Sequence, residues 1–318
     1  MNLQNKKVSI LIPVYNRENL IEETIKSALN QTYENIEVII VDNKSTDKTW
    51  KILQRLALKD KRIKIFQNET NVGPVRNWKR CIDEARGEYG KILWSDDLIA
   101  PAFLEKTVYF LEKTDIGFVF TGTEIFVDDT DEKFAYYFIG STGEYKSEQY
   151  IDGVLFNSTY PVSPGCALFR LKDLKKNLLV DVPNKVNSDF SMHAIGNDLL
   201  IFLLTANQYN KFAFVSEKLA FFRSHKDSIS ILTNDGKLRL YYNLASAYFV
   251  ENYRKDLIKK MNSKLILNIL RYLDGAKKYN LNKITHYYLT NDIFVLDYKY
   301  IINKVIGIVL FKVGYIKR

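Results

Sequence analysis

The chain has 318 residues, 47% of them hydrophobic, enough for one large domain or a domain of about 220 residues with an appendage. Its two cysteines, Cys81 and Cys166, lie far apart without a CxxC spacing. This excludes a disulfide framework and a cysteine-based zinc site, and it predicts two buried thiols in a reducing compartment. The net charge of +9 favours partners rich in negative charge, namely nucleic acids, anionic lipid headgroups or diphosphate-bearing ligands.

The sequence shows neither a secretory leader nor a membrane span. Residues 1–7 lead directly into the first apolar strand and contain no apolar region followed by a small-residue cleavage site. No uninterrupted apolar run approaches the roughly 20 residues that span a bilayer. We therefore expect a cytoplasmic protein, either free or attached peripherally to the inner face of the membrane.

The first 121 residues alternate between segments of strand and helix periodicity. We predict strands at 8–13, 36–41, 62–67, 90–94 and 116–121, and helices at 18–30, 46–58, 74–84 and 101–113. The strand at 36–41 is almost entirely apolar, which is typical of a parallel sheet with both faces covered. Strands that alternate with helices predict βαβ units, and hence an α/β fold with a mostly parallel sheet.

The pattern weakens after residue 124 and changes again near residue 234. Residues 188–207 have helical periodicity, and 212–215 and 219–223 are typical of short strands. Residues 236–318 are helical in pattern and rich in Tyr and Lys, so we place a boundary near residue 232. The stretch 300–318 is apolar with basic residues at intervals. It fits a helix lying in a membrane interface and, equally, a terminal helix packed on the domain.

Polar residues follow four of the predicted strands, at 13–17, 42–47, 68–77 and 95–97. In an open α/β sheet, ligands bind outside the carboxyl ends of the strands, where these loops would meet. Asp96 and Asp97 repel each other unless water, a cation or a partner offsets their charge. Hard divalent cations bind such carboxylates, although a capped strand-to-helix turn explains the pair alone equally well. Together with Tyr15, Asp42 and Arg76, the pair fits a site for a nucleotide diphosphate.

Five ordered segments resemble the family 2 glycosyltransferases, which have the GT-A fold. They are Ile-Leu-Ile-Pro-Val-Tyr-Asn at 10–16, Val-Asp-Asn-Lys-Ser-Thr-Asp at 41–47, Asn-Val-Gly with Arg-Asn at 71–77, Ala-Arg-Gly-Glu-Tyr at 85–89 and Ser-Asp-Asp at 95–97. The resemblance covers roughly residues 6–232 and implies a GT-A domain at 1–232. Its nucleotide-binding half would span about 1–121 and its acceptor half about 122–232, followed by a helical region at 233–318, which we leave open as membrane-associating.

The resemblance implies a role for each loop in binding a nucleotide-diphosphate sugar. Pro13 and Tyr15 would flank the nucleotide base, Asp42 would bind its N–H edge, and Arg76 and Asp96 would help to hold the nucleotide.

The resemblance also implies a metal site. Asp97 would ligate Mn²⁺ or Mg²⁺ bridging the diphosphate, and the segment 222–230 resembles a loop from which His225 would reach the metal or the diphosphate. In that loop Arg223 or Lys226 would add positive charge. The family often has an acid where this chain has Trp94, which leaves fewer carboxylates for the metal and predicts weaker metal dependence. Asp42 is also followed by Asn43-Lys44 instead of the usual acidic residue and glycine.

The acceptor half is expected to supply a general base. Gly-Asn-Asp-Leu-Leu at 196–200 resembles the family's Glu-Asp-x-x-Leu segment, with Asn197 in place of the glutamate. Asp198 matches the carboxylate that removes the acceptor hydroxyl proton in an inverting transfer, although it could instead cap or interrupt the helix. Ser163-Pro164-Gly165-Cys166 resembles an acceptor-side loop.

The resemblance therefore predicts an inverting, metal-dependent glycosyltransferase with a UDP-linked donor. Its acceptor would be a glycan or a polyprenyl-diphosphate-linked intermediate in bacterial surface polysaccharide synthesis, such as capsule or O-antigen, with an anionic membrane surface as a further partner. A catalytically inactive nucleotide-sugar binder is the main alternative, because Trp94 and Asn197 replace acids. A Rossmann dinucleotide enzyme is disfavoured because no GxGxxG follows the first two strands, and a nucleic acid is not expected as a partner because no known binding module appears.

Overall fold

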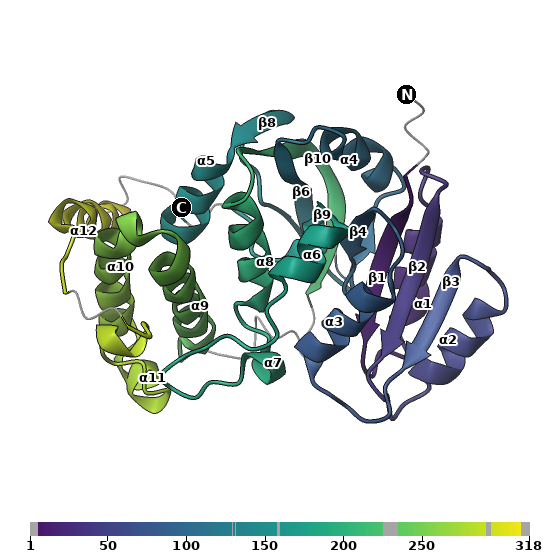
Figure 1. Ribbon diagram of the computed structural model, residues 1–318, viewed down its shortest axis with the longest axis horizontal. Coiled ribbons are helices and arrows are strands. Elements are labelled where there is room, and N and C mark those ends of the chain that lie inside the picture. Colours follow the sequence, from purple (N-terminus) through teal and green to yellow (C-terminus); the bar gives the residue numbers. More distant parts are fainter. Residues whose placement is uncertain are drawn as a thin grey trace. The chain divides into compact units, whose positions relative to one another are not determined.

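The chain divides into an N-terminal unit and a C-terminal unit. The structure, a computed structural model, describes residues 6–128, 130, 132–157, 160–224, 235–290 and 294–312, with backbone alone at 308, 309, 311 and 312 (Figure 1). The N-terminal unit comprises Met1–Asp181 and Asp189–Ser228. The C-terminal unit comprises Val182–Ser188 and Ile229–Arg318. The predicted boundary near residue 232 lies outside the described residues.

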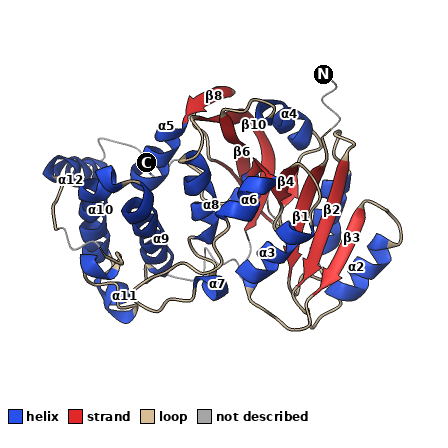
Figure 2. Ribbon diagram, in the orientation of Figure 1, coloured by secondary structure: helices blue, strands red, loops and turns tan. Residues whose placement is uncertain are grey.

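The N-terminal unit is built on one sheet in the order β3-β2-β1-β4-β9-β6-β10-β5, with β7 beside β6 and β8 beside β10 (Figure 2). Strands β3, β2, β1 and β4 are parallel, β9 is antiparallel to both of its neighbours, and β6 and β10 are again parallel. The strands are β1 (Val8–Val14), β2 (Ile36–Asp42), β3 (Ile63–Gln67), β4 (Tyr89–Ile92), β5 (Leu98–Ile99), β6 (Ile116–Val127), β7 (Lys133–Tyr136), β8 (Gly143–Lys146), β9 (Ala167–Arg170) and β10 (Lys211–Ser224). The expected α/β class with a mostly parallel sheet is confirmed.

Helices connect these strands. They are α1 (Ile21–Leu29), α2 (Thr49–Ala57), α3 (Pro74–Glu84), α4 (Phe103–Leu111), α5 (Ser147–Asp152), α6 (Leu171–Asn177), α7 (Phe190–His193) and α8 (Asn197–Ala206), with a π-helical turn η2 (Gly153–Asn157) and a 3₁₀ turn η3 (Pro164–Cys166). Every residue of β1 and β2 is buried, as the continuous apolar runs predict for strands covered on both faces. Cys81 and Cys166 are buried free thiols, as expected.

The prediction of one helix over residues 188–207 was wrong. The structure has two helices there, α7 and α8, separated by a turn with Ala194 at φ 56° and Gly196 at φ 107°. Both values lie in the left-handed region, which ends a right-handed helix. The turn places Asn197 and Asp198 at the start of a new helix instead of inside a longer one.

The two strands predicted at 212–215 and 219–223 form a single strand, β10. Its register against β6 shifts between Val215 and Lys218, and again before Ala220, so a bulge interrupts the apolar pattern that the sequence shows. Strand β6 also extends to Val127, well beyond the predicted end. Phe118 of β6 stacks on Phe212 of β10 with ring centroids 5.5 Å apart, which explains why the segment is rich in aromatic residues.

The C-terminal unit is helical, as expected. It contains α9 (Lys237–Tyr253), a 3₁₀ turn η4 (Lys255–Leu257), α10 (Ile258–Arg271), α11 (Leu273–Lys278), a 3₁₀ turn η5 (Ile284–His286) and α12 (Tyr298–Lys312). Buried polar side chains connect these elements. The Asn262 side-chain amide donates to Val295 O at 3.1 Å, and its oxygen accepts from the Tyr288 hydroxyl at 2.8 Å. Among the described residues, no helix has both the length and the apolar character needed to cross a membrane.

Asp235 provides a stability test for the C-terminal unit. Hydrogen bonds from Tyr279 and Lys278 lower the pKa of Asp235 to about 2, below its ordinary value, and so favour the ionised form in the folded state. That contribution to stability is complete above about pH 4 and is lost as the pH falls toward 2. Asp235→Asn should lower the free energy of unfolding by about 1 kcal/mol at pH 7, with the difference shrinking at acid pH.

Urea unfolding followed by circular dichroism across this pH range measures the effect. The control is Asp274→Asn, which removes an exposed carboxylate from α11 and should leave the stability unchanged. A pH-independent loss in Asp235→Asn would contradict the ionic explanation.

Candidate active site

The loops after β1 and β2 meet at the carboxyl edge of the sheet. The strands pair in parallel register, which sets Val14 opposite Asp42. Asn16 joins the two loops, because its side-chain oxygen accepts from the Thr46 backbone N–H at 2.8 Å, while its own backbone N–H donates to the Ser45 hydroxyl at 2.9 Å. Pro13 is buried in β1, whereas Tyr15, just after the strand, is 40% exposed.

Asp42 is fully buried at the last position of β2. Its carboxylate accepts hydrogen bonds from the Ser45 backbone N–H at 3.1 Å, from the Ser45 hydroxyl and from the Gln67 side chain at 2.9 Å. A carboxylate has about four acceptor positions, so these donors orient Asp42 and leave capacity for one ligand N–H.

Asp96 and Asp97 lie four and five residues after β4 in a tight turn, which is closed by a hydrogen bond from Asp97 N–H to Trp94 O at 3.1 Å. Asp97 is 6% exposed, and its carboxylate accepts from the Arg223 backbone N–H at 2.9 Å. The Asp96 carboxylate accepts from Arg17 Nε at 3.3 Å. Burial raises the pKa of Asp97 well above its ordinary value, and the neighbouring charge of Asp96 adds to this. A positive charge placed here would therefore stabilise the ionised pair.

Arg223 of β10 holds this turn in place. Its Nε donates to Asp96 O at 2.9 Å, and its remaining donors reach Asp128 and, at 2.6 Å, Glu23. The side chain is only 5% exposed and lies over the Phe126 ring. The sequence suggested Arg223 as a source of positive charge for a diphosphate, but the structure shows its guanidinium engaged by this chain's own oxygens. His225 and Lys226, the other residues predicted from this segment, lie outside the described residues.

Lys91 is a buried cation that the sequence analysis missed. It sits in β4 with no exposed surface, and its amine donates to Ile92 O at 2.9 Å and to Gly165 O. Burial lowers the pKa of Lys91 to about 7, although electrostatic interactions with Cys166 and Asp97 act to raise it. The signal was a lysine inside an otherwise apolar strand. By binding Gly165, Lys91 connects the end of β4 to the turn η3.

Trp94 makes a second connection to η3. Its ring N–H donates to the Ser163 hydroxyl at 2.9 Å, and its ring centroid lies 4.7 Å from that of Trp78 on α3. A Cβ at Gly165 would lie 3.0 Å from the Trp94 ring, so the close approach favours glycine. The position where an acid was expected therefore carries an aromatic ring that anchors the segment 163–166.

Asp198 lies in the first turn of α8, which packs against η3. It is 8% exposed, and one carboxylate oxygen accepts from the backbone N–H groups of Gly196 at 3.0 Å and Leu199 at 2.8 Å. The neighbouring Asn197 is fully buried and its amide donates to Leu179 O at 2.8 Å. The structure thus places Asp198 at a helix start, where the backbone dipoles favour its charged form.

The hydrogen-bond partners of Arg76 are residues other than Asp42. Its guanidinium donates to the Ser191 hydroxyl and reaches Asp181 at 3.4 Å. Arg76 thereby joins α3 to the segment before α8, while its side chain stays 44% exposed. Arg223 holds Asp96 and Asp97 in one turn, whereas the Arg76 guanidinium binds Ser191 and Asp181.

Within the described residues, no group of three or more His, Cys, Asp or Glu side chains could hold a metal ion by itself. The chemistry of Asp96 and Asp97 nevertheless fits a hard cation, because two adjacent carboxylates with a raised Asp97 pKa favour a bound positive charge. A cation held by two protein carboxylates keeps other positions for water and substrate oxygens.

Comparisons with known proteins agree with this arrangement. Residues 9–178 match the family described as Glycosyl transferase family 2. Glycosyltransferase GlyG of Streptococcus pneumoniae is 26% identical over 275 residues, which cover 84% of this chain and 82% of that protein. The putative teichuronic acid biosynthesis glycosyltransferase TuaG of Bacillus subtilis is 37% identical over 38% of this chain and 48% of its own. Matches to two uncharacterized glycosyltransferases of Haemophilus influenzae, at 44% and 40% identity, span only 42% and 33% of those proteins.

Solved structures share the fold. Staphylococcus aureus TarS 1–349, in complex with UDP-GlcNAc, superposes with a TM-score of 0.61 at 19% identity, covering 86% of this chain and 73% of that one. The mannosyltransferase PcManGT of Pyrobaculum calidifontis, in complex with GDP-Man and Mn²⁺, gives 0.52 at 16% identity, covering 96% and 80%. These likenesses confirm the expected GT-A fold. With more than half of its residues matching the family, the chain belongs to glycosyl transferase family 2.

Proposed function

We propose that the N-terminal unit transfers a sugar, with inversion, from a UDP-linked donor to a hydroxyl of a glycan or polyprenyl-diphosphate-linked acceptor. The observation that carries the proposal is the Asp96–Asp97 turn with its buried Asp97, held by Arg223 at the sheet edge where β2 ends in the buried Asp42. The UDP-GlcNAc complex of TarS supports the donor class. The name of TuaG, a putative teichuronic acid biosynthesis glycosyltransferase, supports a role in a bacterial surface polymer.

The donor would be held by the loops at the sheet edge. The exposed Tyr15 ring offers a stacking face for the base above the buried Pro13, and the oriented Asp42 carboxylate accepts a base N–H. Arg76 helps to hold the nucleotide by exchanging its exposed contact with Asp181 for a ligand oxygen.

Asp96 and Asp97 would hold Mn²⁺ or Mg²⁺ at the diphosphate, with His225 as a further ligand. The bound cation would neutralise the negative charge that builds up on the leaving diphosphate. Arg223 orients both acids for this role from its contacts with Asp96 O and Asp97.

Asp198 would act as the general base. Its carboxylate takes the proton of the acceptor hydroxyl while that oxygen forms a bond to the anomeric carbon. The bond between the anomeric carbon and the diphosphate oxygen breaks on the opposite face, and the diphosphate leaves as the anion. Two backbone N–H groups donate to one Asp198 oxygen and so fix the orientation of the carboxylate. Neither N–H group can take up the acceptor proton in place of Asp198.

We place this reaction in the cytoplasm, on the inner side of the membrane. The two buried free thiols, Cys81 and Cys166, support a reducing compartment.

A panel of nucleotide sugars tests the donor assignment. In the presence of Mn²⁺, a UDP-sugar should raise the melting temperature of the full chain by several degrees and be hydrolysed slowly, whereas GDP- and CMP-sugars should have smaller effects. Preference for another nucleotide would refute the UDP assignment. Binding without hydrolysis or transfer to any hydroxyl acceptor would instead favour the inactive binder, in which Trp94 and Asn197 replace catalytic acids.

A further inference from the structure

The positive charge of the chain is concentrated in its last ninety residues. Residues 229–318 contain 16 Lys or Arg and 6 Asp or Glu, a balance of +10. Residues 1–228 contain 30 Lys or Arg and 31 Asp or Glu, a balance of −1. The attraction for anions that the total charge of +9 indicates therefore belongs to the C-terminal unit, whereas the proposed donor site lies in the nearly neutral N-terminal unit.

The same unit exposes an apolar stripe on α12. Tyr298 is 70% exposed, Ile302 56%, Val305 44% and Ile306 50%. Their spacing of four, three and one residues puts them on one face of the helix. Of the sixteen large apolar side chains that are exposed in the described part of the chain, nine belong to the C-terminal unit. An apolar face of this extent indicates an interaction surface.

Basic side chains accompany the stripe. Lys304 of α12 and Lys260 of α10 lie over the Tyr300 ring, with their amines 5.5 and 5.9 Å from its centroid. Lys264 is close enough to Arg239 and Lys304 that these charges, in addition to burial, lower its pKa to about 7. Cations gathered in this way repel one another, and a surface of negative charge would offset that repulsion.

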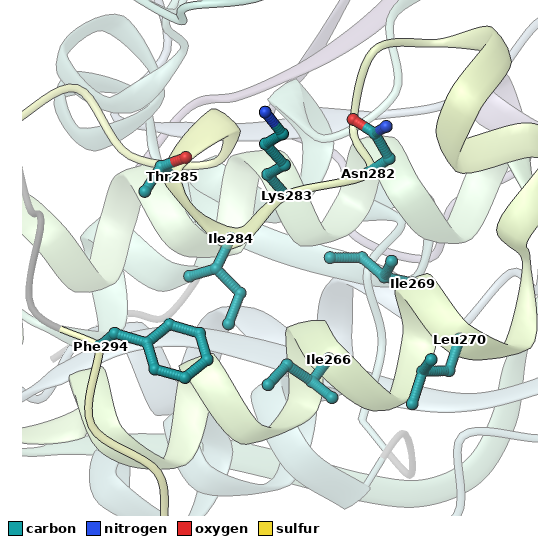
Figure 3. Close-up of a pocket in the computed structure, with 8 residues that line it drawn as sticks. All are labelled: Ile266, Ile269, Leu270, Asn282, Lys283, Ile284, Thr285 and Phe294. Atoms are coloured by element: carbon teal, nitrogen blue, oxygen red, sulfur yellow. The ribbon is translucent and has the colours of Figure 1, made fainter.

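The same unit contains a groove lined mainly by apolar side chains (Figure 3). It has a volume of about 410 Å³ and is lined by side chains from α10, from the segment around η5 and from Phe294, four residues before Tyr298. Leu270 is 61% exposed and Phe294 63%, so the groove presents apolar side chains to the outside, as the stripe on α12 does. Lys283 is the one cationic lining residue. The mostly apolar lining suits part of a lipid acyl chain.

We propose that the C-terminal unit docks on an anionic lipid bilayer, with α12 lying in the plane of the interface. The fifteen-residue helix is about 22 Å long, shorter than the roughly 30 Å hydrocarbon core, which favours lying over spanning. The stripe Tyr298–Ile302–Val305–Ile306 enters the acyl boundary, and the lysines remain at the headgroups. A second copy of this unit is the less favourable occupant, because two surfaces of the same strong positive charge repel each other. The inference concerns a surface that sugar transfer does not use.

Sedimentation of the full chain with vesicles tests this proposal. Vesicles of phosphatidylcholine with phosphatidylglycerol should bind the chain at low salt, and binding should weaken on raising NaCl from about 0.05 to 0.5 M. Vesicles of phosphatidylcholine alone should bind it far less. The double variant Ile302→Asp with Ile306→Asp should lose at least about tenfold in binding. The variant Lys299→Glu with Lys304→Glu should bind more weakly and with a smaller salt dependence.

Leu58→Asp is the control for adding an aspartate at an exposed apolar position, because Leu58 is 90% exposed on the N-terminal unit, and this variant should bind like the wild type. Undiminished binding of the Ile302/Ile306 variant, with its circular dichroism spectrum unchanged, would overturn the proposal. So would equal binding to neutral and anionic vesicles. The wild-type chain could instead fail to bind anionic vesicles but form dimers, and the Ile302/Ile306 variant could abolish those dimers. That result would show that the stripe binds a second copy of the chain.

Discussion

Asp198→Asn is expected to lower the rate of sugar transfer by about 10²- to 10⁴-fold, the usual contribution of a positioned general base. An amide cannot take the acceptor proton, but its oxygen can still accept from the Gly196 and Leu199 backbone N–H groups, so α8 should keep its start. UDP binding should change by less than about twofold, because the loss falls on the chemical step. Single-turnover transfer and UDP titration measure the two effects separately.

Asp173→Asn is the matched control for this experiment. Asp173 is 4% exposed, comparable to Asp198 at 8%, and it accepts from the Tyr209 hydroxyl at 2.8 Å in the same unit. This variant should transfer sugar at the wild-type rate once it is folded. If Asp198→Asn transfers sugar at the wild-type rate, Asp198 is not the general base. A loss that follows a lower melting temperature in both variants would show that burial, not proton transfer, accounts for it.

Asp97→Asn is expected to abolish the enhancement of UDP binding by Mn²⁺. The substitution keeps the volume and the oxygen that accepts from the Arg223 N–H, so the turn should persist. It removes the charge, and a neutral amide is a much weaker ligand for a hard cation. We expect UDP affinity in Mn²⁺ to fall by about tenfold, a loss of roughly 1.4 kcal/mol, with affinity in EDTA unchanged.

Isothermal titration with UDP in Mn²⁺ and in EDTA checks this prediction. The control is Asp83→Asn, which removes a carboxylate paired with Lys79 on the surface of α3 and should leave the Mn²⁺ effect intact. An Asp97→Asn protein that still responds to Mn²⁺ would place the metal elsewhere. If the wild-type chain binds UDP equally with and without Mn²⁺, the site does not depend on the metal. That result would agree with the replacement of an acid by Trp94.

The first half of the N-terminal unit could be predicted from sequence because its signals are local. The strands β1 to β3 and helices α1 to α3 begin and end within a few residues of the predicted bounds, and the predicted helix at 74–84 is α3. Continuous apolar strands alternate there with amphipathic helices, and each turn residue acts on its own neighbours. Parallel pairing then brings the strand ends to one edge, which is why Asp42 and the turn at 95–97 could be assigned to the same region.

Longer-range interactions decided the second half. A bulge opposite β6 merges two predicted strands into β10, and the left-handed turn at Ala194 and Gly196 divides one predicted helix into α7 and α8. The residues at the bulge and at the left-handed turn do not interrupt the apolar periodicity of the sequence around them clearly enough for either feature to be predicted. The membrane interpretation of 300–318 gains support only when the exposed face of α12 is known, because the same composition suits a packed helix.

The sequence by itself determined the α/β class, the family and the acids of the candidate site, since these depend on periodicity and on short ordered motifs. Only the tertiary structure decided how those acids are held. The sequence suggested Arg223 as a cation for a diphosphate, but in the structure it hydrogen-bonds to the Asp96–Asp97 turn. Lys91, which the sequence did not single out, connects β4 to Gly165. Contacts between residues 70 to 130 positions apart leave no periodic trace in the chain, because they arise only when the sheet has assembled.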